Sequence, residues 1–268
     1  MERTLISREE CKNIQMGILD VITKVCEQHG WKCYLAYGTL LGAVRHKGYI
    51  PWDDDIDLYM SRSDYSELVA WMKKEKYEES DWLKILDMDT EGYYFPYAKA
   101  VNCRTEAIMD TNLTKHGVWI DIFPVDNVPD NKALGNLFCL CCKVLRETNV
   151  AMTMNFESRK IRKRFRKRIA SWIACAVGKR RMARFYDRVC QTYSNKHTEH
   201  AACLSGAYGK RERMPKSVLF VPTKLSFEGK SYTGTAEYDA YLKTMYGDYM
   251  QLPAEEKRIT HDVTAYYK

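Results

Sequence analysis

The chain has 268 residues, of which 46% are hydrophobic and 12% aromatic, so it can bury a large core and is not a disordered chain. No apolar run reaches the roughly 18–20 residues that a bilayer-spanning helix needs. The net charge of +7 comes from one segment, because residues 159–184 hold twelve Lys and Arg and no Asp or Glu, which leaves −5 for the rest of the chain.

The first half of the chain predicts alternating helices and strands. Ser7 and Glu10 have the spacing of an N-terminal capping box, apolar residues then recur at helical intervals, and Gly30 is a natural helix end. Further elements are predicted, in chain order, as a strand at 32–37, a short helix at 39–45, a half-buried strand at 55–60, a helix at 64–74, and strands at 82–86, 93–101 and 118–123.

After about residue 128 the pattern becomes mostly helical, without an internal repeat or a low-complexity linker. The predicted elements are helices at 130–150 and 158–195, a hairpin at 219–234, a helix at 236–247 and an irregular end. We therefore expect an α/β (α+β) protein, with a mixed-sheet core at 1–128 and a mostly helical part at 129–268.

Four carboxylates fall within the five positions 53–57, in the stretch WDDDIDL. Such closely spaced like charges repel and raise one another's pKa, so either a cation offsets them or the stretch is a solvated loop. On a strand, Asp53, Asp55 and Asp57 share one face and can converge on a divalent cation. A calcium loop of the D-x-D-x-D-G type is less suitable, because Leu58 and Asp64 stand where it needs Gly and Glu.

Two other features give the carboxylates a chemical context. Gly38 and Thr39 follow a buried strand and open a helix, where free backbone N–H groups form a phosphate-binding turn. Asp121 lies between two isoleucines in an apolar strand, and a buried carboxylate there needs a partner or a metal. Together these are the parts of a metal-dependent phosphoryl-transfer site.

The run GTLLGAVRHKGYIPWDDDIDLYMSRSDY at 38–65 resembles the signature of the LicD family of phosphocholine transferases, which the fukutin-related proteins share. Three further stretches are similar to that family and follow in the same order: GVWIDIFPVD at 117–126, FEGKSYTGTAEYDAYL at 227–242 and YGDYMQLPAEEKRITHD at 246–262. The middle region has no such match, and Ala254 stands where a second proline is expected.

The resemblance implies a nucleotidyltransferase-like fold that uses Mg²⁺ or Mn²⁺. It carries metal-binding roles to Asp55 and Asp57, joined by Asp53, and a third carboxylate role to Asp121, either as a metal ligand or as acceptor of the substrate's proton. It also places Gly38 and Thr39 at the phosphate-binding turn.

Other side chains near these motifs are candidates for contact with a donor such as CDP-choline. Arg45, Lys47 and Lys99 offer positive charge to phosphate, with a solvated surface position as the alternative. A choline ammonium needs aromatic faces, for which Trp52 and Tyr94 are the candidates, although aromatic residues at such positions are more often core residues.

The function that the resemblance implies is transfer of phosphocholine from CDP-choline to a hydroxyl of a cell-surface glycan precursor, of teichoic acid, capsule or lipopolysaccharide, with release of CMP. One alternative is transfer of another phospho-substituent, such as a phospho-polyol or phosphoethanolamine, from its CDP-linked donor. A nucleotidyltransferase acting on RNA or a small molecule and an inactive membrane-bound scaffold are the other two.

The basic segment at 158–188 predicts a helix that lies in a membrane interface. Its apolar residues recur every three or four positions with cations between them, which suits an anionic lipid surface. Nucleic-acid binding and a solvated helix with an apolar core face are the alternatives; we expect no nucleic-acid partner because the rest of the chain is acidic. With no secretory signal in MERTLISREECKN, we expect a cytoplasmic protein on the inner face of the cell membrane.

Overall fold

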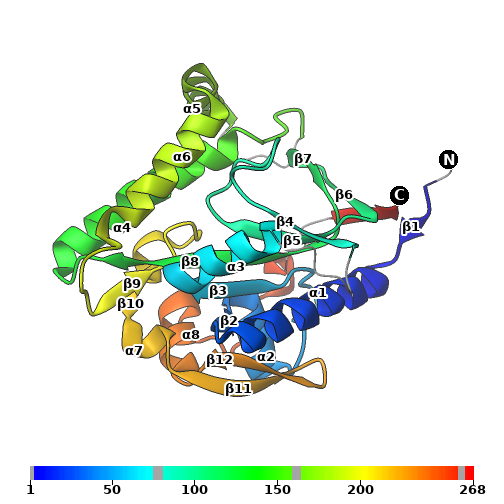
Figure 1. Ribbon diagram of the computed structural model, residues 1–268, viewed down its shortest axis with the longest axis horizontal. Coiled ribbons are helices and arrows are strands. Elements are labelled where there is room, and N and C mark those ends of the chain that lie inside the picture. Colours follow the sequence, from blue (N-terminus) through cyan, green and yellow to red (C-terminus); the bar gives the residue numbers. More distant parts are fainter. Residues whose placement is uncertain (1–2, 75–80, 159–163, 259–262) are drawn as a thin grey trace.

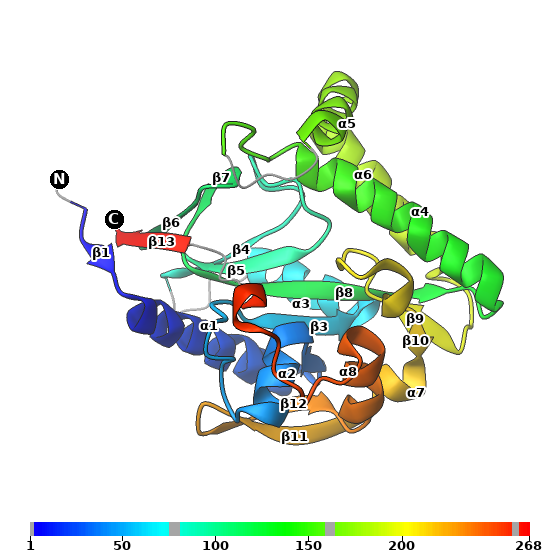
Figure 2. The same cartoon turned by 180° about the vertical axis from the view of Figure 1, so that it is seen from behind.

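The computed structural model describes residues 3–74, 81–158, 164–258 and 263–268, and a seven-stranded mixed sheet lies at its centre (Figures 1 and 2). The order of its strands is β10 (Met214–Pro215), β9 (His200–Ala202), β8 (Trp119–Val128), β3 (Asp57–Ser61) and β2 (Cys33–Leu35). β5 (Ala98–Asn102) pairs with the first half of β8 and with β4 (Leu83–Leu86). Only the β3–β8 pair is parallel among these described pairs, so the expected mixed α/β class is confirmed.

The helices of the first half begin and end close to the predicted positions. α1 (Arg8–His29) starts where the Ser7 hydroxyl accepts a hydrogen bond from the Glu10 N–H at 3.1 Å, and it ends at Gly30 with φ 76°. Glycine adopts this left-handed conformation without a steric penalty. α2 (Tyr37–Arg45) and α3 (Arg62–Lys74) follow β2 and β3, and α3 packs on β3, β4 and β8.

Three predicted strands have different bounds in the structure. β3 begins at Asp57, which leaves Asp53 and Asp55 in the preceding loop. β5 begins only at Ala98, because the rings just before it pack on one another: Tyr93, Phe95 and Tyr97 have pairwise centroid distances of 5.3–6.4 Å. β8 continues to Val128 because β9 pairs with its last residues.

A second, four-stranded sheet was not predicted. It has the order β1 (Leu5–Ile6), β13 (Val263–Tyr267), β6 (Thr105–Met109) and β7 (Asn112–His116). β13 lies between β1 and β6, so the two ends of the chain are neighbours in the same sheet (Figure 1).

Segments after residue 128 complete the central core. β11 (Pro222–Phe227) and β12 (Lys230–Thr235) form the predicted hairpin, and α7 (Lys216–Leu219) and α8 (Tyr238–Tyr246) flank it. Phe227 and Leu242 are fully buried in the same hydrophobic cluster as Ile18, Leu40 and Met60 from the first half. The main core therefore contains residues from both sides of position 128.

The remaining helices form an arm that projects from one end of the sheet (Figures 1 and 2). α4 (Lys132–Ala151), α5 (Arg164–Val177) and α6 (Lys179–Cys190) make up this arm. It is anchored at its base by Arg62 of α3, which donates to both carboxylate oxygens of Asp126 at 2.7 Å and to Asp187 of α6 at 3.1 Å. In the described parts of the chain, none of the helices is both long enough and apolar enough to cross a bilayer.

Candidate active site

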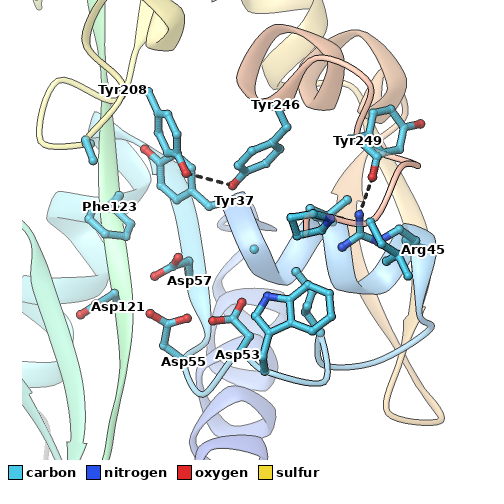
Figure 3. A pocket seen from close by; sticks show the side chains of 18 of the residues that line it. Tyr37, Arg45, Asp53, Asp55, Asp57, Asp121, Phe123, Tyr208, Tyr246 and Tyr249 are labelled. Carbon is cyan, nitrogen blue, oxygen red and sulfur yellow. Dashed lines mark hydrogen bonds between the residues drawn. The ribbon is translucent and has the colours of Figure 1, made fainter. Parts of the chain in front are cut away.

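A cavity of about 880 Å³ lies where the start of β3, the first turn of α2 and the chain around 246–254 meet. Asp53, Asp55, Asp57 and Asp121 all line it. Figure 3 shows these aspartates on one side of the cavity and Tyr37, Tyr208 and Tyr246 on the other. The cavity therefore has an acidic half and an aromatic half.

The register of three neighbouring strands brings Asp57, Asp121 and Lys99 into one row. Asp57 of β3 pairs with Asp121 of β8, and Asp121 pairs with Lys99 of β5. Directly opposed residues point to the same face of a sheet. The Lys99 ammonium donates to the Asp121 carboxylate at 2.5 Å, and both side chains are buried.

The pKa of Asp57 lies well above its ordinary value because the carboxyl is buried and because Asp55, Asp121 and Asp53 repel its charge. Burial likewise raises the pKa of Asp121, although the Lys99 ammonium opposes this shift. Both shifts indicate that the positive charge of Lys99 does not balance the carboxylates around this cavity. A bound cation would supply the missing positive charge.

The loop before β3 sets the positions of Asp53 and Asp55, and the first turn of α2 supports it. A Cβ atom on Gly38 would lie 2.5 Å from an Asp53 carboxylate oxygen, so only glycine leaves room for that carboxylate. The Thr39 hydroxyl accepts a hydrogen bond from the Asp57 N–H at 2.9 Å, which ties α2 to the start of β3. Thus Gly38 lines the cavity, whereas the Thr39 side chain is buried behind it.

The donor set suits Mg²⁺ or Mn²⁺, because these hard cations prefer carboxylate oxygens and four carboxylates share this cavity. No three acidic, histidine or cysteine side chains of the described residues are already close enough to form a ready metal cluster. The residues fit such an ion in chemistry and in location.

Comparison with known proteins agrees with this geometry. The model of the LicD/FKTN/FKRP nucleotidyltransferase domain matches residues 30–136, the part of the chain that contains all four aspartates. Residues 30–136 are therefore similar to this nucleotidyltransferase domain. The chain is also 29% identical to the lipopolysaccharide cholinephosphotransferase LicD of Haemophilus influenzae, over 98% of both chains. The resemblance to the LicD family is confirmed.

Of the three cations expected to bind phosphate, only Arg45 lines the cavity. Arg45 lines it, with its guanidinium donating to the Tyr249 carbonyl at 2.5 Å (Figure 3). Lys47 is exposed and does not line it. Lys99 does not line it either, because its ammonium is buried against Asp121. Arg146 of α4 does line it, held by the Ser205 carbonyl at 2.9 Å.

The two aromatic residues expected to bind choline lie in different cavities. Trp52 lines the cavity, but the Arg258 guanidinium lies over its ring at 4.9 Å. Tyr94 lies in a different hollow beside α6, where the Lys179 ammonium is 5.8 Å from its ring. Five tyrosines also line the cavity: Tyr37, Tyr97, Tyr208, Tyr246 and Tyr249.

Arg146 and Tyr208 come from the region that matches none of the family motifs, and their proximity results from tertiary packing. One local signal was present for Tyr208, which stands in the glycine-flanked stretch GAYG at 206–209. A Cβ on Gly206 would meet the Glu212 carboxylate and the Tyr37 hydroxyl at 2.1 and 2.4 Å. Tyr246, by contrast, begins one of the family-like stretches.

Proposed function

We propose that the protein transfers phosphocholine from CDP-choline to a hydroxyl of a cell-surface glycan precursor, such as a lipopolysaccharide, teichoic acid or capsule intermediate, and releases CMP. The observation that carries this proposal is the cavity in which four aspartates of a LicD-type domain face two arginines and a group of tyrosines. Similarity to a lipopolysaccharide cholinephosphotransferase along nearly the whole chain supports choline as the transferred substituent.

The reaction is a displacement at the phosphorus that carries choline. The acceptor hydroxyl oxygen forms a new bond to this phosphorus, the bond to the bridging oxygen of CMP breaks, and the hydroxyl proton passes to a carboxylate. A bound Mg²⁺ or Mn²⁺ would supply charge neutralisation for the diphosphate. Asp53, Asp55 and Asp57 are the residues that would hold it, with Asp121 as a further ligand or as the acceptor of the proton.

The protein's own cations and backbone orient the donor. Arg45 and Arg146 line the cavity and present guanidinium groups to the diphosphate, each already held by a backbone carbonyl. Lys99 acts indirectly, because its ammonium fixes the Asp121 carboxylate in the row that faces Asp57. The acidic half of the cavity thus becomes the reaction centre.

The donor can be tested by incubating the protein and Mg²⁺ with CDP-choline, CDP-ethanolamine, CDP-ribitol or a nucleoside triphosphate, and measuring CMP and pyrophosphate. We expect CMP from CDP-choline, and a loss of about 10³-fold in rate for Asp57→Asn, by analogy with the removal of one transition-state charge contact. Glu237→Asn, on the exposed surface before α8, is the control.

Each alternative has its own outcome in this assay. If CMP is released from CDP-ribitol alone, the transferred group is a phospho-polyol and not phosphocholine. Release of pyrophosphate from a nucleoside triphosphate would indicate a nucleotidyltransferase. If no donor is cleaved and no divalent ion binds, the protein is a scaffold and the proposal is wrong.

We also propose that the arm binds the inner face of the cell membrane, which would bring the cavity to a lipid-linked acceptor. Large apolar side chains on α5 are exposed, including Phe165 at 78% and Trp172 at 74%. Exposed arginines accompany them on α5 and α6: Arg166, Arg168, Arg180, Arg181 and Arg184. Aromatic residues beside cations suit an anionic lipid interface better than a nucleic acid, which needs little exposed apolar surface. Residues 159–163 of the basic segment lie outside the described residues.

A further inference from the structure

Four aromatic rings from four separate segments meet at one end of the cavity. Tyr37 begins α2, Phe123 lies in β8, Tyr208 precedes the short 3-10 helix Gly209–Glu212, and Tyr246 ends α8. We call these four residues the aromatic corner. The centroids of neighbouring rings are 5.5–5.8 Å apart for the pairs Tyr37–Phe123, Tyr37–Tyr208 and Tyr208–Tyr246.

A buried carboxylate lies directly behind the aromatic corner. The Glu212 side chain accepts hydrogen bonds from the Tyr37 hydroxyl at 3.0 Å and from the Tyr208 N–H at 3.1 Å, and Glu212 is only 4% exposed. On the cavity side, the charge of Asp57 acts on the hydroxyls of both Tyr208 and Tyr246, whose pKa values lie above the ordinary value mainly because of burial. The rings themselves have negative faces, which attract a cation.

We infer that the aromatic corner binds the trimethylammonium group of the choline donor, with the Glu212 side chain behind it holding the Tyr37 hydroxyl and the Tyr208 backbone in place; the identity of the donor rests on the proposed function. A quaternary ammonium has no N–H to donate, so it is recognised through ring faces and long-range charge rather than through hydrogen bonds. The row of Asp57 and Asp121 lies in the same cavity, so this end holds the choline while the acidic half receives its phosphate.

The inclination of the rings favours a compact cation over a flat base. Tyr208 and Tyr246 meet at 86°, and Tyr37 and Phe123 at 90°, so the corner has no pair of parallel open faces among these neighbours. The one nearly parallel pair, Tyr37 and Tyr208, is already stacked on itself at 5.8 Å, which leaves no space for a ring between them. A tetrahedral ammonium can contact several inclined faces at once, whereas a cytosine ring needs a slot.

The test uses two phosphate esters of the same shape, phosphocholine and 3,3-dimethylbutyl phosphate, in which an uncharged carbon atom replaces the ammonium nitrogen. Each is titrated calorimetrically into the full chain with Mg²⁺. We expect the protein to prefer phosphocholine by about tenfold or more, the range of a desolvated cation–π contact. Tyr208→Leu and, independently, Tyr246→Leu should abolish the preference. Tyr208→Phe, which keeps the ring, should retain it.

Any of three outcomes would overturn the inference. The first two are equal affinity of the unmodified chain for both esters and a preference that survives both leucine variants. A third is loss of CMP affinity, rather than of phosphocholine affinity, in Tyr208→Leu, which would assign the corner to the base. Tyr267→Leu, which removes a tyrosine from β13 outside the cavity, controls for general effects, and thermal unfolding of each variant checks that it folds.

This binding test is separate from the donor assay. If phosphocholine binds through the corner but CMP is never released from CDP-choline, the transferase proposal fails and the corner remains an ammonium site. If CMP is released but the leucine variants leave the choline preference unchanged, the corner assignment fails and the transferase proposal remains.

Discussion

Three of the four aspartates at the cavity are each positioned by one identifiable neighbour. Lys99 holds the Asp121 carboxylate, Thr39 accepts a hydrogen bond from the Asp57 backbone, and the missing side chain of Gly38 admits the Asp53 carboxylate. Lys99 and Thr39 were predicted to contact phosphate. In the structure both side chains are buried, contact aspartates and do not line the cavity, so phosphate contact by Lys99 and by the backbone turn at Thr39 stays a prediction.

Glu212 predicts a dependence of stability on pH. Burial raises its pKa from 4.5 to about 7, against the hydrogen bonds from Tyr208 and Tyr37 and the charges of Arg146 and Lys143. Between these two pH values the unfolded chain has released a proton that the folded chain keeps, so the contribution of Glu212 to stability falls as pH rises and the penalty is complete above pH 7.

We expect Glu212→Gln to gain up to about 3 kcal/mol relative to the unmodified chain between pH 5 and pH 8, because glutamine does not titrate. The measurement is the free energy of unfolding in denaturant at several pH values, in the absence of donor. Glu237→Gln, at an exposed position, is the matched control. If the free energy of unfolding changes with pH in the same way for Glu212→Gln and the unmodified chain, the prediction is wrong.

Among the elements, the acidic loop before β3 shows where sequence periodicity stops predicting the backbone structure. Alternation of polar and apolar residues at 55–60 correctly indicated a strand with Asp57 directed to one face. It also suggested that Asp53 and Asp55 belong to that strand, but the backbone of 53–56 makes a loop whose course is set by contacts with α1 and α2. Gln15 of α1, for example, donates to the Asp54 carbonyl at 2.9 Å.

The short strands of the four-stranded sheet were the other elements that local pattern did not reveal. β6, β7 and β13 have only five residues each, and the pairing of β13 with β6 joins segments more than 140 residues apart, as in Ala265 with Ala107. Such strands have little periodicity of their own, because the partner rather than the segment decides whether they form.

The connection of the arm to the sheet predicts a large effect of one arginine. Arg62 bridges Asp126 of β8 and Asp187 of α6, and all three side chains are largely buried. Removal of the arginine leaves two buried carboxylates without their cation, so we expect Arg62→Ala to lower the free energy of unfolding by about 3–5 kcal/mol. Denaturant unfolding measures this effect.

The matched control is Arg104→Ala, which breaks an ion pair with Asp81 whose two side chains are both more than half exposed. Exposed pairs of this kind contribute little, so the control should stay close to the unmodified chain. Equal effects of the two substitutions would show that Arg62 does not anchor the arm.

At the level of the whole molecule, distant segments complete both the core and the cavity. The chain end returns to pair with the beginning through β13 and β1, and the hairpin β11–β12 and α8 close the core beside α2. The stretch 246–254 then forms one wall of the cavity, opposite the aspartates of the first half. The change in sequence pattern at residue 128 therefore does not coincide with an edge of the hydrophobic core, which contains residues from both sides of it.

The exposed apolar surface of the arm predicts membrane binding. We expect the chain to sediment with vesicles of mixed phosphatidylcholine and phosphatidylglycerol, more weakly at high salt, because the attraction to anionic lipid is screened. The double variant Phe165→Ser/Trp172→Ser should bind at least about tenfold less, since two large apolar side chains leave the interface.

Val221→Ser, at an exposed apolar position away from the arm, is the control and should bind like the unmodified chain. Binding that is unaffected by the double variant, or equal on neutral vesicles, would argue against an anionic membrane as the partner of the arm.

The sequence by itself indicated the resemblance to the LicD family, the acidic stretch as a candidate site and most helices, because motifs, caps and apolar periods are properties of neighbouring residues. Only the tertiary structure decided which cation faces which aspartate, which aromatic rings share the cavity, and how the last strand closes the terminal sheet. Those outcomes depend on strand register and on burial between segments far apart in the chain, and no local spacing specifies either.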